Sequence, residues 1–125
     1  MKILIVDDQD SILRIIKGLL VELGYNDIRT ASNGQKACAV LKQEKIEMVI
    51  SDWNMPQMSG IELLKYVRHD PQLLNLPFIM VTAEAEKDNI VEAIQAGVDQ
   101  YVVKPFSADD LKKKMDLAFR KRVKK

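Results

Sequence analysis

Five polar side chains stand where short apolar segments end, and together they could carry out phosphoryl chemistry. They are Asp7, Asp8, Asp52, Thr82 and Lys104. A carboxylate can act as a nucleophile and form an aspartyl phosphate. Phosphoryl transfer mainly requires positioning and neutralisation of charge, which the Lys104 ammonium and the Thr82 hydroxyl would supply. The residue types therefore indicate a phosphoacceptor site built on one of these carboxylates.

The three carboxylates also indicate a bound cation. Carboxylates that crowd together repel one another and cost stability unless a cation neutralises them. Mg²⁺ suits carboxylate oxygens, takes few protein ligands, and keeps waters and phosphate oxygens in its shell. His69 is expected in a solvated loop and no cysteine is near in sequence, so nothing indicates zinc. Considered alone, Asp8 or Asp10 could instead cap the helix that is expected to follow.

The elements that must position these residues alternate between strand and helix. Short apolar runs predict strands, most of them buried on both faces, over residues 3–6, 28–31, 48–50, 78–82 and 101–103. Apolar residues at helical spacing predict helices between them, over residues 12–23, 37–41, 61–67, 90–94 and 111–119. Ser59 and Ser107 each begin a capping-box pattern, and Gly24 and Gly97 are natural helix stops.

This alternation predicts a single α/β domain over residues 1–125 with a doubly wound, five-stranded parallel sheet flanked by five helices. Right-handed crossovers limit the strand order to a few arrangements, and periodicity alone does not choose among them. In an open parallel sheet, ligands bind outside the carboxyl ends of the strands. The five polar residues collect at those ends, so we expect the site there.

The composition is that of an ordinary globular protein. The chain has 125 residues, of which 47% are hydrophobic and 30% charged, with a net charge of +1. Cys38 is the only cysteine, which excludes an internal disulfide and fits a reducing compartment. No apolar run approaches the roughly 18 residues of a membrane span and no signal peptide is seen, so a cytoplasmic protein is expected. Residues 112–125 hold eight of the nineteen Lys and Arg residues, a pattern that favours a solvated helix face over a nucleic-acid site.

Taken in order, the motifs resemble the receiver domain of bacterial response regulators. The motifs are Asp7-Asp8, Asp52, Thr82-Ala83-Glu84 and Lys104-Pro105-Phe106. The resemblance spans the whole chain and is strongest towards the single-domain chemotaxis regulators of this family. It rests on residues 51–56 (SDWNMP), 60–65 (GIELLK), 80–85 (MVTAEA), 95–97 (QAG) and 101–106 (YVVKPF).

The resemblance implies a flavodoxin-like fold with strand order 2-1-3-4-5 and a site with assigned roles. A histidine kinase would phosphorylate Asp52. Asp8, Asp52 and the backbone carbonyl of Asn54 would hold Mg²⁺, with Asp7 acting mainly through water. Lys104 would pair with the phosphoryl group, and the Lys104-Pro105 bond would be cis.

The resemblance also implies a signalling protein in a two-component phosphorelay rather than an enzyme, one that promotes its own phosphorylation and dephosphorylation. The Thr82 hydroxyl would bond the phosphoryl group, and Tyr101 would then rotate inward as a switch. The expected output is protein contact by a monomer, with the flagellar motor switch as target, a phosphatase as a further partner, and no DNA. Some positions depart from the chemotaxis pattern: Gln9, Asp10, Ser59, Asp99, Gln100 and Lys112 to Lys114. Those from Asp99 onwards fall on the family's partner-binding face, so a target in another phosphorelay, or a non-flagellar protein, stays open.

Two other classes of protein fit less well. Asp8 and Asp10 match the D-x-D pattern of haloacid-dehalogenase-type phosphatases, but the chain lacks a cap insertion and that reading leaves Asp52 without a role. A flavodoxin-type flavin carrier would need a Gly- and Ser/Thr-rich phosphate cradle after the first strand. The acids found there would repel a flavin phosphate.

Overall fold

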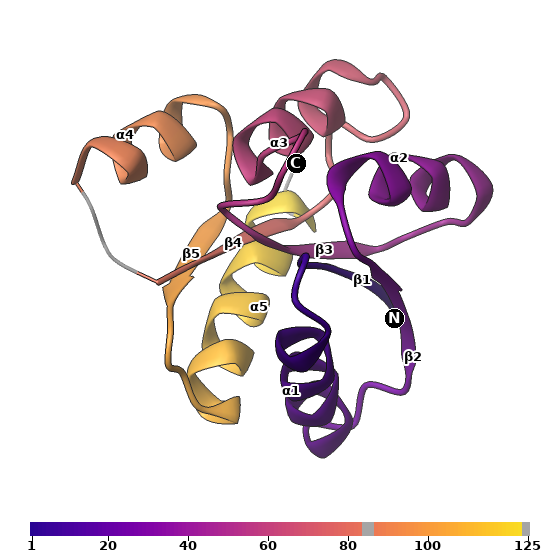
Figure 1. Cartoon of the computed structure of the whole chain (residues 1–125), viewed down its shortest axis with the longest axis vertical. Helices are drawn as coiled ribbons and strands as arrows, with labels where there is room; N and C mark the ends of the chain where they lie inside the picture. The colour runs from indigo at the N-terminus through magenta and orange to yellow at the C-terminus, as the bar shows by residue number, and fades with distance from the viewer. Residues whose placement is uncertain (84–86, 124–125) are drawn as a thin grey trace.

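Strands and helices alternate along the chain as the sequence predicts (Figure 1). The computed structural model describes residues 1–83 and 87–123, so Glu84 and Ala85 of the motif over residues 80–85 lie outside the described residues. In chain order the elements are β1 (Lys2–Val6), α1 (Asp10–Glu22), β2 (Asp27–Ala31), α2 (Gly34–Gln43), β3 (Met48–Asp52), α3 (Gly60–His69), β4 (Phe78–Thr82), α4 (Lys87–Gln95), β5 (Gln100–Val103) and α5 (Ala108–Val123).

The strands form one parallel sheet in the order β2-β1-β3-β4-β5. This confirms the fold class and the strand order that the resemblance implied. The chain starts in the middle of the sheet, winds outward to β2, and then returns past β1 to β3 and on to the edge strand β5 (Figure 1). The order therefore reverses between β1 and β3, which is where ligand sites form in open parallel sheets.

Each face of the sheet is covered by its own helices, because successive side chains of a strand point to opposite faces. Alternate residues such as Ile3 and Ile5 pack with α1 and α5 in one core, while Leu4 and Val6 pack with α2, α3 and α4 in the other. Figure 1 shows α1 and α5 on one side of the sheet and the other three helices opposite. Cys38 is half-buried and packs against the second core.

The capping boxes predicted at two helices are confirmed, and the alternative left open at the first helix does not hold. Ser59 and Glu62 form a reciprocal capping box at the start of α3. Ser107 and Asp110 exchange the same pair of bonds at α5. Neither Asp8 nor Asp10 caps α1, whose N-cap residue Gln9 makes no side-chain cap bond.

His69 was also expected in a loop, but it is the exposed last residue of α3. Its ring Nδ1 lies 2.7 Å from the Lys65 carbonyl oxygen, and bonds of this kind are common in a last helical turn. None of the described helices is long and apolar enough to span a membrane.

The resemblance placed Asp99 on the family's partner-binding face, but the structure buries its side chain. Its side chain is 0% exposed and ion-paired to Arg68 at 2.9 Å and to Arg122 at 2.6 Å. It also accepts the backbone N–H of Phe78 at 2.9 Å. This cluster joins the last turns of α3 and α5 to the start of β4 and β5, so Asp99 is a structural residue at the amino edge of the sheet.

Candidate functional site

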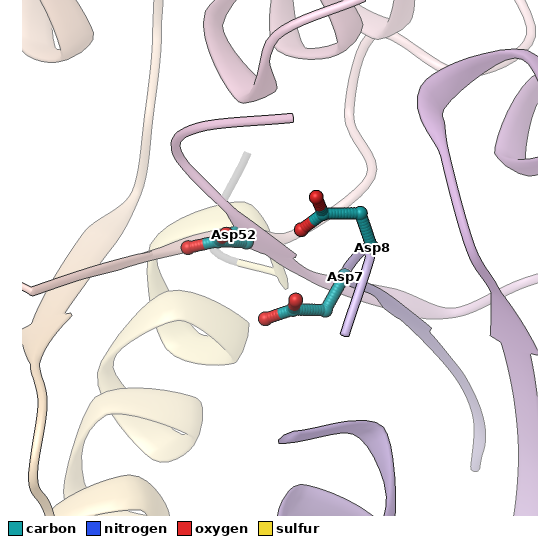
Figure 2. A group of neighbouring side chains, drawn as sticks. All are labelled: Asp7, Asp8 and Asp52. Carbon is teal, nitrogen blue, oxygen red and sulfur yellow. The ribbon is translucent and has the colours of Figure 1, made fainter. Parts of the chain in front are cut away.

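Three carboxylates meet at the carboxyl edge of the sheet, where β1 and β3 end side by side. Asp7 and Asp8 follow β1 directly, and Asp52 ends β3. Each offers one carboxylate oxygen, and these three oxygens all lie within 4.8 Å of one another. Figure 2 shows the three side chains extending to the same side of the strand ends. Asp7 is buried, Asp52 half-buried and Asp8 exposed, so the group opens to solvent on one side.

Asp7 holds one oxygen in place and leaves the other unbonded. Its Oδ1 accepts the backbone N–H of Gln9 at 2.9 Å. Its Oδ2 is buried without a hydrogen-bond partner, and the Lys104 Nζ lies 3.7 Å away. Burial raises the pKa of Asp7, the negative charges of Asp52 and Asp8 add to the rise, and the Gln9 amide and Lys104 oppose it. A buried acceptor with no donor is costly, so this oxygen is the strongest indication that the group suits a cation.

Asp52 has an ammonium partner and is nevertheless strained electrostatically. The Lys104 Nζ donates to Asp52 Oδ1 at 3.3 Å, and the Asp52 side chain is 12% exposed. Burial raises the pKa of Asp52 despite the opposing effect of Lys104, and Asp8 raises it further. One ammonium therefore serves two carboxylates and has a third nearby. The site keeps an excess of negative charge.

Lys104 and Thr82 reach this edge from the last two strands. Thr82 ends β4 and is 7% exposed. The Lys104 backbone N–H donates to the Thr82 carbonyl at 2.7 Å, which continues the β4–β5 pairing by one residue. The Lys104-Pro105 bond is cis, as the resemblance implied. All five polar residues that the sequence placed at strand ends are therefore at the same edge of the sheet.

Asn54 and Tyr101 are the other two residues that the sequence assigned to the site. Asn54 is exposed in the loop two residues beyond Asp52. Tyr101 is half-buried on β5, opposite Met80 of β4 in the strand register. It packs against the core on the α4 side of the sheet.

Gly60, which was not singled out from the sequence, lets the chain after Asp52 pack closely against β3 and β4. A Cβ on Gly60 would lie 2.3 Å from the Asp52 carbonyl oxygen and 2.7 Å from the Met80 sulfur. Gly60 also donates its N–H to the Trp53 carbonyl at 2.9 Å. A glycine at the first position of a helix, just after its capping Ser59, was the signal that could have revealed this close approach.

The site fits a hard divalent cation in its donor atoms. It offers three carboxylates, one of which has a buried oxygen with no donor, and Mg²⁺ prefers such oxygens. The open side at Asp8 leaves room for waters or for oxygens of a phosphoryl group. Chemically, the arrangement can neutralise a cation and present the Asp52 carboxylate next to an ammonium.

Comparison with known proteins identifies the family. A model of the response regulator receiver domain matches residues 3–116. The chain is 51% identical over 119 residues to the chemotaxis protein CheY-3 of Vibrio cholerae, an alignment that covers 95% of this chain and 92% of the relative. The chain is also 51% identical over 119 residues to the chemotaxis protein CheY of Pseudomonas aeruginosa, and this alignment covers 95% of this chain and 96% of the relative.

Solved structures agree with this assignment. Chemotaxis protein CheY4 of Vibrio cholerae has a TM-score of 0.86 at 35% identity and covers 92% of this chain and 95% of its own. A CheY-like receiver domain protein of Methanospirillum hungatei also has a TM-score of 0.86, at 32% identity, with 98% and 96% covered. Because the family model and these relatives cover nearly the whole chain, the protein belongs to the response regulator receiver domains and is a CheY-like member of that family.

Proposed function

We propose that Asp52 accepts a phosphoryl group from a phosphohistidine of a sensor kinase, and that this modification changes the affinity of the protein for a target. The observation that carries the proposal is the pairing of Asp52 Oδ1 with the Lys104 ammonium at 3.3 Å beside two further carboxylates. Asp7 shares the group and the ammonium, but its Oδ2 is buried at a longer 3.7 Å from Lys104 Nζ and its Oδ1 accepts the Gln9 amide, which favours Asp52 as the acceptor. The domain acting in this way is the whole of residues 1–125.

The transfer needs few groups. A carboxylate oxygen of Asp52 attacks the phosphorus, the phosphorus–nitrogen bond of the donor breaks, and the departing imidazole keeps the electron pair and takes up a proton. Lys104 is already placed to follow the oxygens of the new acyl phosphate as a compact positive charge. Thr82, at the end of β4, supplies a hydroxyl that can donate to one of these oxygens. Attack by water on phosphorus would later regenerate the free carboxylate, so the phosphorylated state would have a limited lifetime.

Asp8, Asp52 and the Asn54 backbone carbonyl would hold Mg²⁺, with the unbonded oxygen of Asp7 contributing mainly through a water. When bound, the ion supplies positive charge to the carboxylates and to the phosphoryl oxygens. Asp7 Oδ1 accepts the Gln9 amide, and this hydrogen bond fixes the direction of Oδ2. The chain's own contribution is thus to hold three acids together against their repulsion.

The output that we propose is contact with the flagellar motor switch, through Thr82, Tyr101 and the face formed by α4, β5 and α5. The names of the two bacterial relatives, both chemotaxis proteins, support this target. Burial of Asp99 removes one of the departures that argued against it. The exposed Lys112 and Lys113 still differ from the chemotaxis pattern, so a non-flagellar target is the second candidate. We further propose that the protein acts as a cytoplasmic monomer, and that a phosphatase shortens the signal.

The chemistry is tested with acetyl phosphate and Mg²⁺, followed by mass spectrometry of the modified residue. Label should appear on Asp52 alone. Asp52→Asn keeps the side-chain shape and should accept none, whereas Asp116→Asn, at an exposed acid of α5, should label like the wild type. Label of comparable yield on Asp52→Asn would disprove the assignment.

The target is tested separately with beryllofluoride, which imitates the phosphoryl group. Retention of the motor switch protein by immobilised beryllofluoride-treated protein, and not by the untreated form, would support the chemotaxis output. Retention of a different protein under the same contrast would support the second candidate.

A further inference from the structure

Lys114 of α5 points its ammonium at an aromatic ring rather than at a carboxylate. Its Nζ lies 5.4 Å from the centroid of the Tyr101 ring. Lys114 is half-buried, whereas Lys112 and Lys113 are exposed. Lys112 forms an ion pair with Asp116 at 3.3 Å. Among the described residues no carboxylate forms an ion pair with Lys114. The pKa of Asp110, one turn earlier in α5, is lowered mainly by its bonds with Ser107 and to a smaller extent by the charges of Lys113 and Lys114. The Tyr101 ring is the partner that Lys114 has and Lys113 lacks.

The contact joins the two faces of the sheet around its edge. Tyr101 packs against the core beneath α2, α3 and α4, while α5, which carries Lys114, covers the opposite face. These faces meet at β5, which is the edge strand. A lysine side chain is long enough to pass the edge and place its head over the ring. The orientation of Tyr101 is therefore coupled to α5 by a contact that does not run through the cores.

We propose that Lys114 is a positioning residue that holds Tyr101 in its present orientation and so sets how readily the protein responds to phosphate at Asp52. This inference rests on the proposed function, in which Tyr101 changes orientation when Asp52 is phosphorylated. The strand register gives the physical path. Tyr101 lies opposite Met80 on β4, and the Met80 sulfur lies against Gly60, next to the Asp52 carbonyl.

The size of the effect follows from the strength of a cation over a ring. A cation within about 6 Å of a ring centroid stabilises the arrangement enough to change a two-state population about two- to fivefold at a partly exposed position. Inward rotation of Tyr101 would break this contact, so Lys114 favours the resting state. Linkage then requires that removal of the contact raise the affinity of the Asp52 site for a phosphate mimic by the same factor.

The test compares three substitutions with the wild type. Lys114→Met removes the charge and keeps the length of the side chain. Lys114→Arg keeps a cation that can stack on the ring and should restore wild-type behaviour. Lys113→Met makes the same change of net charge one residue away, at an exposed lysine without an aromatic partner. Beryllofluoride affinity in saturating Mg²⁺ is read from the fluorescence of Trp53, the only tryptophan.

We expect Lys114→Met to bind beryllofluoride about two- to fivefold more tightly than the wild type, and the other two variants to bind like the wild type. The second readout is fluorine NMR of 3-fluorotyrosine protein, in which Tyr101→Phe identifies one of three tyrosine signals. In Lys114→Met without beryllofluoride, the Tyr101 signal should move towards its position in the beryllofluoride-bound wild type. Neither readout involves a partner, so a loss of partner contacts at Lys114 cannot imitate the result.

Equal beryllofluoride affinity and an equal Tyr101 signal in Lys114→Met and Lys113→Met would overturn the role of Lys114 and leave the proposed function intact. A wild type that binds beryllofluoride with no movement of the Tyr101 signal would also overturn it, because there would be no reorientation for Lys114 to oppose. Failure of the wild type to bind beryllofluoride at all would overturn the proposed function itself, together with this inference.

Discussion

The two edges of the sheet carry charge clusters of opposite balance. At the carboxyl edge, Asp7, Asp8 and Asp52 share the single ammonium of Lys104. At the amino edge, Asp99 is shared by two guanidinium groups, from Arg68 and Arg122. One cluster has too many acids for its bases, and the other has too many bases for its acid.

At the amino edge, hydrogen bonds within the protein satisfy the excess of guanidinium groups. Both oxygens of Asp99 are bonded, one of them also to the Phe78 amide. The spare guanidinium N–H groups donate to backbone carbonyls of Leu74, Leu76 and Gly97. Burial lowers the pKa of Arg68 to about 10, helped by Arg122 and opposed by Asp99, so the group stays charged at neutral pH.

At the carboxyl edge, the excess of negative charge is not balanced by protein groups. Asp7 Oδ2 has no hydrogen-bond partner, and burial raises the pKa values of both Asp7 and Asp52. A protein that can satisfy a buried carboxylate fully at one edge has no structural need to crowd three at the other. The contrast separates a cluster whose charges are balanced by protein groups from one whose carboxylates are compatible with a bound cation.

The largest expected effect is at the amino edge. Asp99→Ala should lower the free energy of unfolding by about 3–5 kcal/mol, because it leaves two buried guanidinium groups without their counter-charge. Urea unfolding followed by circular dichroism measures the change. Asp116→Ala, which breaks the exposed pair with Lys112, is the control and should cost no more than about 0.5 kcal/mol. Similar costs for the two variants would mean that the Asp99 cluster is not structural.

Mg²⁺ should have the next largest effect, and only through the carboxyl edge. At a metal concentration about 100 times its dissociation constant, binding should stabilise the wild type by about 2.7 kcal/mol. Asp8→Asn should lose most of this gain, since it removes a carboxylate of the site, while Asp116→Asn should keep it. Melting temperature with and without chelator reports both. A wild type that is indifferent to millimolar Mg²⁺ would contradict the metal site.

Asp7→Asn should act in opposite directions with and without metal. In chelator it should stabilise the protein by on the order of 1 kcal/mol at neutral pH, because it removes a buried charge that repels its neighbours. With Mg²⁺ present it should weaken metal binding instead. If Asp7→Asn is destabilising in chelator, the unbonded oxygen is satisfied in a way that the structure does not reveal.

The pH dependence has a definite sign in the metal-free protein. The pKa values of Asp7 and Asp52 are raised from 3.8 in the folded state, so between 3.8 and the raised values the folded state binds more protons than the unfolded state. Stability from these two groups is therefore fully present below pH 3.8 and is lost as the pH rises through the folded pKa values. Denaturant titrations in chelator should show this loss in the wild type and a smaller loss in Asp7→Asn.

The sequence predicted which polar residues gather at the carboxyl edge because polar residues at strand ends are adjacent in sequence to the strands that place them. Asp7, Asp52, Thr82 and Lys104 each follow an apolar run, and parallel strands bring such ends together. The strand order itself came from the resemblance, because periodicity alone does not specify it.

The amino-edge cluster was missed for the opposite reason. Arg68 and Arg122 lie in the last turns of two helices, where basic residues usually reach solvent and complement the helix dipole. Nothing local marks them as partners of Asp99, which is 31 residues from Arg68 and 23 from Arg122. Only the packed fold brings them together, and the resemblance had placed Asp99 on the family's partner-binding face instead.

The smallest expected effect extends the comparison of the two edges to the backbone. At the amino edge the left-handed positions are glycines, Gly24 and Gly97, each with a φ of 96°. Among the described residues at the carboxyl edge, the left-handed position is Gln57, with a φ of 69°, in the loop that follows Asp52. The Met58 amide donates across it to the Pro56 carbonyl at 2.7 Å, which makes a tight three-residue turn.

A residue with a side chain pays about 1–2 kcal/mol to adopt this backbone conformation. Glycine avoids this cost, but it loses about 0.5–1 kcal/mol more in chain entropy on folding. Gln57→Gly should therefore stabilise the protein by roughly 0.5 kcal/mol. Gly24→Ala is the matched reverse change, since its Cβ would meet nothing within 4 Å, and it should destabilise through the backbone alone. Strain that is kept in a loop beside a reactive group commonly serves its geometry. Gln57→Gly should then also slow the phosphorylation of Asp52 by acetyl phosphate, whereas Gly24→Ala should leave the rate unchanged. A stabilised Gln57→Gly variant with a wild-type rate would show that the strain at this edge serves no purpose in the chemistry.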